Sequence, residues 1–260
     1  MNERMQILKM LEEGKINAQE AERLLEALSQ SDSRERKSKF KLLSSLEGIP
    51  KFISAAIGNA IEDQQGEESM QYAVKKKLSF NGISGDLTIA GKDTDKIEIL
   101  RDGFAKIKQD DETLHVKTLS GDVSISLPPN TDISVAGISG NINVADINGT
   151  IRIESVSGDI TGKNLSGSML GEFVSGDVDL DYDKVAKIRI KTRSGDVTLR
   201  LDKKEEAKLD VDTGSGSISC DFELKDEEKS SNKLRGIINK AAAEIEIMSK
   251  SGDVTIKKRG

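Results

Sequence analysis

The chain has 260 residues, with 39 Lys and Arg against 45 Asp and Glu, one His, one Cys and no Trp. One Cys excludes an internal disulfide, one His excludes a multi-histidine metal site, and no stretch approaches the ~18–20 apolar residues that span a bilayer. The net charge of −6 argues against nucleic-acid binding. The start of the chain carries Glu3 and lacks the basic and apolar parts of a secretion signal, so we expect a cytoplasmic protein.

Residues 1–29 are predicted to form a helical hairpin. Apolar residues recur at helical spacing from Met5 onward, Gly14 ends the first helix, and Asn17 with Glu20 forms a capping box for the second. A hairpin of this size buries little apolar surface alone, so we expect self-association or binding of a protein partner. The residues predicted to make that contact are Leu8, Leu11, Leu24, Leu25 and Leu28.

Residues 30–70 are predicted to be a linker that contains an amphipathic helix at about 49–62. Arg34 to Lys41 is basic, and apolar residues then recur at three- and four-residue steps, among them Phe52, Ile53 and Ile57. A basic stretch before an apolar helix suits peripheral contact with an anionic membrane. Alternatively, the helix packs on an open end or face of the following domain, which the small residues of its polar side favour.

Residues 71–260 contain a short repeat. Five consecutive nonapeptides run from Ile133 to Asp177, and each has apolar residues at its first and sixth positions and an apolar residue or Gly at its third, before a Ser-Gly or Asn-Gly pair. Apolar residues two apart point to the same side of a strand. Gly adopts positive φ at little cost, and Ser, Asn and Asp bond to nearby backbone groups, so each nonapeptide is predicted to be a short strand followed by a corner.

The same unit recurs on both sides of this run. Its Ser-Gly corners are separated by 36, 19, 18, 18, 19, 21 and 36 residues, which predicts coils of about 18 residues. Each gap of 36 is read as two coils, with Gly103 or Gly236 near its middle. The predicted structural corners are Gly85, Gly121, Gly140, Gly158, Gly176, Gly195, Gly216 and Gly252.

The fixed period favours a β-solenoid over a hairpin meander. In a solenoid each corner stacks on the next at ~4.7–4.9 Å, so the repeat length must be constant. The fold class is therefore predicted to be mainly β, a β-helix-like stack of eight to ten coils between Leu78 and Ile256. At that spacing the rod would be about 40–50 Å long.

Candidate chemistry is sparse. Asp159, Asp177 and Asp196 would stack at one corner next to Asn141, but one Asp per coil barely supplies the 6–8 oxygens of a calcium site, so solvated turns are favoured. Carboxylates outside the corners are scattered, which predicts no catalytic residue, no metal and no cofactor. Cys220 alternates with apolar residues and His115 lies on the opposite strand face from its neighbours, so we expect a buried thiol and a surface imidazole.

Two stretches resemble known families. The run from Gly14 to Leu28 resembles the SHOCT-like helical module, and the repeated Ser-Gly-Asp coils resemble the toastrack family, also called the adhesin-like or LiaX-like β-strand repeat family. The resemblance implies a non-enzymatic protein of the bacterial cell-envelope stress response, associated with Lia- and phage-shock-type membrane systems. It implies no catalytic motif.

Two functions are open at this point. The first is a cytoplasmic interaction or scaffold protein, also found at the inner face of the membrane, that binds membrane proteins of an envelope stress system. The second is a surface-exposed adhesin-like or carbohydrate-active β-helix. The missing secretion signal favours the first.

Overall fold

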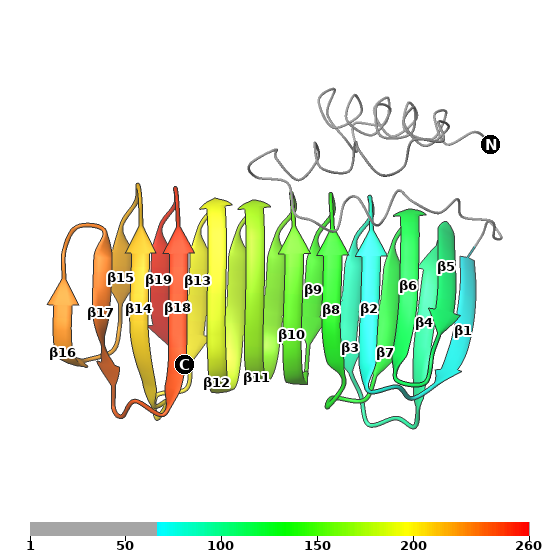
Figure 1. The fold of residues 1–260 in the computed structure, drawn as a ribbon, viewed down its shortest axis with the longest axis horizontal. Coiled ribbons are helices and arrows are strands. Elements are labelled where there is room, and N and C mark those ends of the chain that lie inside the picture. The colour runs from blue at the N-terminus through cyan, green and yellow to red at the C-terminus, as the bar shows by residue number, and fades with distance from the viewer. Residues whose placement is uncertain (1–66, 260) are drawn as a thin grey trace, which may run out of the picture.

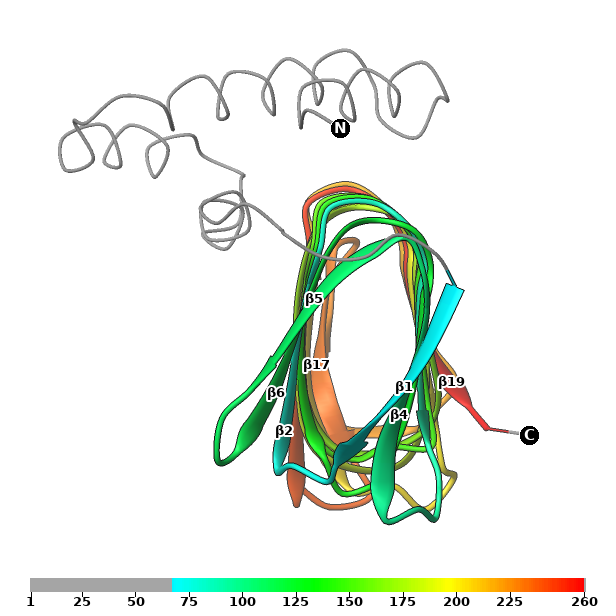
Figure 2. The same ribbon diagram turned by 90° about the vertical axis from the view of Figure 1, so that its right-hand side faces the viewer.

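In the computed structural model the described residues, 67–259, form 19 strands in one continuous sheet. The sheet curls so that two faces oppose one another across a narrow core, and successive coils stack along one axis (Figures 1 and 2). The prediction of a β-solenoid is confirmed. The predicted helical hairpin and the helix at 49–62 lie outside the described residues.

The first face is the one toward the viewer in Figure 1. Its eleven strands, at ~4.8 Å spacing, correspond to a stack about 48 Å long. From one end of the rod to the other they are β5 (Phe104–Gln109), β6 (Thr113–Ser120), β2 (Lys77–Gly82), β8 (Asp132–Gly137), β10 (Asn148–Ser155), β11 (Ile160–Ser175), β12 (Val178–Ser194), β18 (Ala243–Ser249), β14 (Ala207–Thr213), β17 (Lys233–Ile238) and β16 (Leu224–Lys229).

The second face closes the core from behind. The long strands β11 and β12 belong to both faces, since their first residues pair on the second face and their later residues on the first. In the same direction along the rod its other strands are β1 (Glu67–Ala73), β4 (Lys96–Asp102), β7 (Val123–Leu127), β3 (Leu87–Gly91), β9 (Ile142–Ala145), then β11 and β12, and finally β13 (Val197–Leu201), β19 (Val254–Lys258) and β15 (Ile218–Cys220).

Side chains alternate between core and solvent along each strand. In β10, Ile151 and Ile153 are at most 1% exposed, whereas Arg152 and Glu154 point outward. Small aliphatic residues at the same register in successive strands form the continuous core. Ile, Val and Leu suit these positions because their branched side chains pack well on a pleated surface.

The coils are not stacked in chain order. The coil formed by β2 and β3 is stacked between two others. One is formed by β6 and β7, and the other by β8 and β9. At the other end, the coil of β18 and β19 lies between that of β12 and β13 and that of β14 and β15. The first and last coils of the described chain are therefore both interior, and the rod has eight parallel coils.

The reading of each gap of 36 as two coils is wrong. In the first gap, β4 and β5 pair antiparallel with the outermost coil, and Gly103 lies in the turn between them. In the second gap, β16 and β17 form an antiparallel pair, and Gly236 lies within β17. These strands cap the two ends, because an unprotected parallel coil would leave its edge groups unpaired.

Tyr182 is the largest fully buried side chain, with 0% exposure. Its hydroxyl oxygen has no hydrogen-bond partner among the described residues, and burial raises the pKa of this group. An unpaired buried hydroxyl costs about 1–3 kcal/mol, so we expect Tyr182→Phe to unfold at a temperature a few degrees higher. Thermal unfolding followed by circular dichroism measures this. A clear fall in the melting temperature would show that the hydroxyl is satisfied.

Candidate interaction surface

One corner of every coil is a glycine in the left-handed region. All eight predicted corner glycines have φ between 99° and 141°. They form one column, in which seven glycines approach the corner glycine of the next coil and Gly121 approaches Asp102, beside the turn between β4 and β5. A Cβ on Gly158, for example, would lie 2.1 Å from the carbonyl oxygen of Gly140. Only glycine fits there, because both the φ angle and the approach exclude a side chain.

The residues that follow these glycines form a second column, which we call the Asp column. Its seven hydrogen bonds each run from a backbone N–H to the side-chain oxygen of the neighbouring coil, at 2.7–3.0 Å. In spatial order its members are Asp122, Asp86, Asn141, Asp159, Asp177, Asp196, Asp253 and Ser217. The column therefore stitches the coils together, and within the described range no group of three His, Cys, Asp or Glu is placed to bind a metal ion.

Asp159 offers a matched test of this column. Its Oδ1 accepts the N–H of Asp177 at 2.9 Å, and Asn141 already makes the equivalent bond with an amide oxygen. We expect Asp159→Ala to lose about 1 kcal/mol of stability and Asp159→Asn to lose little, because only the alanine removes the acceptor. Chemical denaturation of both variants measures the difference. Equal losses would show that the hydrogen bond is not what matters.

The column also predicts a loss of stability in acid. The Ser217 N–H bonded to Asp253 holds the pKa of that carboxyl below its usual range. Because the folded pKa is the lower one, this contribution is complete above the unfolded value of about 4 and is lost as the pH falls through the folded value. We expect the melting temperature to decrease once the pH drops below about 4. Asp253→Asn, which keeps an acceptor that does not titrate, should weaken this dependence.

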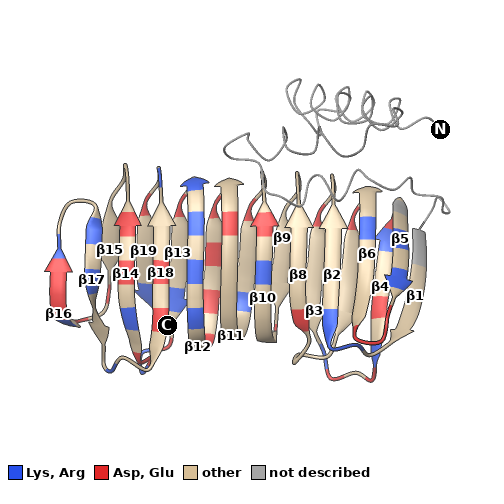
Figure 3. Cartoon of the chain, viewed as in Figure 1, with Lys and Arg blue, Asp and Glu red and all other residues tan. Residues whose placement is uncertain are grey.

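The exposed side of the first face has a charged part and a part with few charges. Between β12, β18, β14 and β17, opposite charges pair across strands, and β8 and β2 carry few charges in Figure 3. The pairs are Lys187–Glu244 at 2.7 Å, Arg189–Glu246 at 2.6 Å, Arg235–Asp210 at 3.0 Å and Lys233–Asp212 at 3.3 Å. Lys187 lowers the pKa of Glu244. These carboxylates are paired with cations of the next strand rather than with one another.

The second face carries a line of short polar side chains, which we call the polar row. One outward residue from each strand takes the same register position, so neighbours are ~4.8 Å apart. In spatial order the row is Ser124, Thr88, Asn143, Thr161, Asp179, Thr198, Thr255 and Ser219. Seven of the eight carry no charge. The row is a regular line of hydroxyl and amide groups that includes one carboxylate, that of Asp179.

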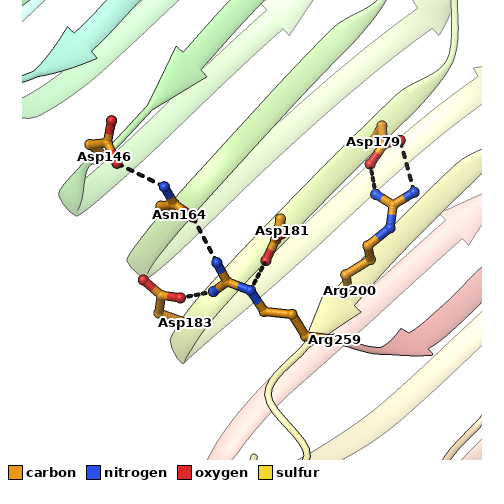
Figure 4. A network of polar contacts seen from close by, with 7 residues as sticks. All are labelled: Asp146, Asn164, Asp179, Asp181, Asp183, Arg200 and Arg259. Atoms are coloured by element: carbon orange, nitrogen blue, oxygen red, sulfur yellow. Dashed lines mark hydrogen bonds and ion pairs between the residues drawn. The ribbon is translucent and has the colours of Figure 1, made fainter.

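Ion pairs border the polar row on one side. Arg259 binds Asp181 and Asp183 of β12 and donates to Asn164 of β11, while Arg200 pairs with Asp179 (Figure 4). Asp181 and Asp183 lie on β12 and Asn164 lies on β11, so Arg259, which follows β19, is held to strands of two other coils. A hollow of about 380 Å³ lies beside this network and is lined by Thr161, Gly162, Lys163, Asn164, Asp179, Asp181 and Arg200.

The two residues singled out for their chemistry have ordinary surroundings. His115 is partly exposed, and its Nε2 lies 3.1 Å from Oδ2 of Asp110. Cys220 is half-buried on the short strand β15, and burial raises the pKa of its thiol. A raised thiol pKa disfavours the nucleophilic thiolate.

The predicted partner-binding residues lie outside the described residues. They are Leu8, Leu11, Leu24, Leu25, Leu28, Phe52, Ile53 and Ile57. Within the described residues, the sequence reasoning missed the polar row and the Arg259 network. The signal for the row was present, because seven of its eight members stand between two apolar residues, as Thr88 does between Leu87 and Ile89, and Thr161 stands between Ile160 and Gly162. The described part of the chain also has no helix long and apolar enough to cross a membrane.

Comparison with known structures gives distant likenesses. A candidate cell adhesion protein from Clostridium sporogenes is 18% identical, with a TM-score of 0.41 over 74% of this chain and 100% of its own. A candidate adhesin from Bacteroides fragilis is 13% identical, with a TM-score of 0.37 over 75% of this chain and 98% of its own. At these scores neither likeness supports a statement about function. Curated proteins gave no match.

Comparison with family models gives two matches. A SHOCT-like domain matches residues 2–33, which contain the predicted helical hairpin. The Toastrack DUF4097 model matches residues 112–257, more than half of the chain and most of the coils described above. The chain therefore belongs to the Toastrack DUF4097 family.

Proposed function

We propose that the protein is a non-enzymatic interaction protein whose β-solenoid presents a surface while its SHOCT-like segment recruits a partner or a second copy. The observation that carries this proposal is the polar row. Short polar side chains at one register position make a regular line about 30–40 Å long by the strand spacing. A line of this length suits an extended partner that runs along the rod, whereas a small substrate would occupy only a concave part of it.

The charged groups of the rod support the same function. Arg200 and Arg259 are paired with acidic residues, and Glu244 and Glu246 on the first face are paired with cations of the next strand. General acid–base catalysis needs a group with a tuned pKa beside a substrate site. These charges instead join neighbouring coils of the rod to one another.

We further propose that the partner is a membrane protein of the bacterial envelope stress response and that the protein acts in the cytoplasm, at the inner face of the membrane. This part rests on the family resemblance. Fractionation of cells tests it, with the protein expected in the cytoplasm and on washed membranes. Recovery mainly outside intact cells would contradict it and would favour the adhesin-like alternative.

The role of the N-terminal segment has its own test. We expect deletion of Met1 to Ser29 to leave the β-solenoid folded and to abolish both self-association and recovery of the partner from detergent-solubilised membranes. Light scattering reports the mass, and affinity capture from the membranes reports the partner. A deletion variant that assembles with the same number of copies and still captures the partner would place both contacts on the rod. Substitution of Thr88 and Thr161 by Lys would then test whether the polar row makes these contacts.

A further inference from the structure

The end of the rod at β1 and β5 has an incompletely covered apolar surface. Within the described residues, β1 pairs only with β4, and β5 pairs only with β6. Their inward side chains Met70, Tyr72 and Ile107 are only partly buried, whereas Ile97 and Ile99, one strand further in, are 0% exposed. Figure 2 looks along the rod at this end, with β1 and β5 nearest the viewer. We call Met70, Tyr72 and Ile107 together the end surface.

The opposite end of the first face is better protected. The edge strand β16 has charged residues at five of its six positions, Lys225 to Lys229, and all five are exposed. Charges on an edge strand oppose the addition of another element. At the near end, β1 is charged only at Glu67 and Glu68, and β5 only at Lys106 and Lys108. Ile218, Cys220 and Leu224 at the other end are also only partly buried, so what distinguishes the end surface is the segment that can reach it.

The segment that can reach the end surface is defined by chain length. The amphipathic stretch 49–62 ends a few residues before β1 begins at Glu67. From Ile61 to Glu67 an extended chain spans at most ~20 Å, less than half of the ~48 Å stack. Ile61 can therefore contact the near end of the rod but not the far end. So short a tether also gives a local concentration of order mM, which favours this segment over any free competitor.

The dimensions of the segment also fit. Fourteen residues of α-helix are ~21 Å long, and the seven residues of β1 extend ~23 Å. A helix of this length can lie along β1 and cover the space between β1 and β5. Ile53, Ile57 and Ile61 are four residues apart and would occupy one side of it.

We infer that residues 49–62 pack as a helix across the end surface, with Ile53, Ile57 and Ile61 against Met70, Tyr72 and Ile107. The same apolar side cannot contact a membrane while it covers the rod. The rod end is thus a docking site for a segment of its own chain, independent of which partner the protein binds.

The two tyrosines provide the test. The chain has no Trp, so in a full-length Tyr182→Phe background Tyr72 is the only tyrosine and the main fluorophore. We expect acrylamide to quench Tyr72 weakly in this background, and roughly twice as steeply after Ile57→Asp, which would open the ring to solvent on one side. Asn59→Asp, on the polar side of the helix, is the matched control and should leave quenching unchanged. Circular dichroism verifies that each variant keeps its strands.

Each outcome of this experiment decides the matter. Equal quenching in the background and in Ile57→Asp would overturn the inference, as would equal increases in Ile57→Asp and Asn59→Asp. Protection that disappears when light scattering shows only monomer would assign the cover to a second copy and would overturn it as well. So would protection seen only with phosphatidylglycerol vesicles. Protection of the monomer without vesicles, lost in Ile57→Asp alone, would establish the docking.

Discussion

Gly158→Val is expected to prevent stable folding of the rod. Gly158 has a φ of 106°, which a β-branched residue adopts only with strain of order 1–3 kcal/mol. Its added Cβ would also lie 2.1 Å from the Gly140 carbonyl oxygen, an atom of the neighbouring coil's backbone that cannot rotate away. The coils of Gly158 and Gly140 would have to separate. We expect a loss greater than about 4 kcal/mol, which is a large part of the stability of an ordinary domain.

Gly137→Ala is the matched control for this variant. Gly137 lies in β8, its φ is not in the left-handed region, and an added Cβ would meet its nearest atoms at 3.8 and 4.0 Å. This substitution should change stability by less than about 1 kcal/mol. Thermal unfolding of both variants, followed by circular dichroism, gives the comparison. Similar melting temperatures for Gly158→Val and the unchanged protein would refute the role of the corner column.

Truncation after Ala242 is expected to have the second large effect. It removes β18 and β19, which pair on both sides with strands of other coils. Ile245, Ile247, Val254 and Ile256 are at most 1% exposed, and burying each contributes about 1.5–3 kcal/mol. Their combined loss, of order 6–12 kcal/mol, is comparable to the 5–15 kcal/mol by which a whole domain is stable. We expect an insoluble chain, or one that unfolds without a cooperative transition.

Truncation after Lys257 controls for the loss of the end of the chain itself. It keeps the four buried side chains and removes Arg259 with its contacts to Asp181, Asp183 and Asn164. Exposed ion pairs contribute at most about 1 kcal/mol each, so the melting temperature should fall by only a few degrees. If the truncation after Ala242 also melted cooperatively, β14 and β15 would be able to stack directly on β12 and β13. The interleaved order would then not be required for folding.

The local structure of the coils could be predicted because it depends on neighbouring residues. Ile151 and Ile153 are two apart and share a side, and the Gly of each Ser-Gly pair is the residue that tolerates positive φ. These facts hold whichever coil lies above or below. The period of 18 residues, the inward residues and the corners therefore follow from the sequence alone.

The order of the coils could not be predicted because their corners are chemically equivalent. The backbone N–H of Asn141 would fit the carboxylate of Asp122 as well as it fits that of Asp86, which accepts it in the structure. Nothing in a single nonapeptide distinguishes the two arrangements. The polar row and the contacts of Arg259 depend on this order, since they join residues far apart in the chain. They become visible only once the stacking is known.

The interior position of the first and last coils restricts how a rod of this design can change in length. At each end of the rod, the first or the last coil of the chain is inserted between two other coils. A duplicated coil added next to it would therefore meet strands that are already paired on both sides. Between Ile133 and Leu201 the coils follow one another without interruption. Insertions or deletions of 18 residues in that stretch would leave both end pieces intact, so related rods should differ in the middle by whole coils.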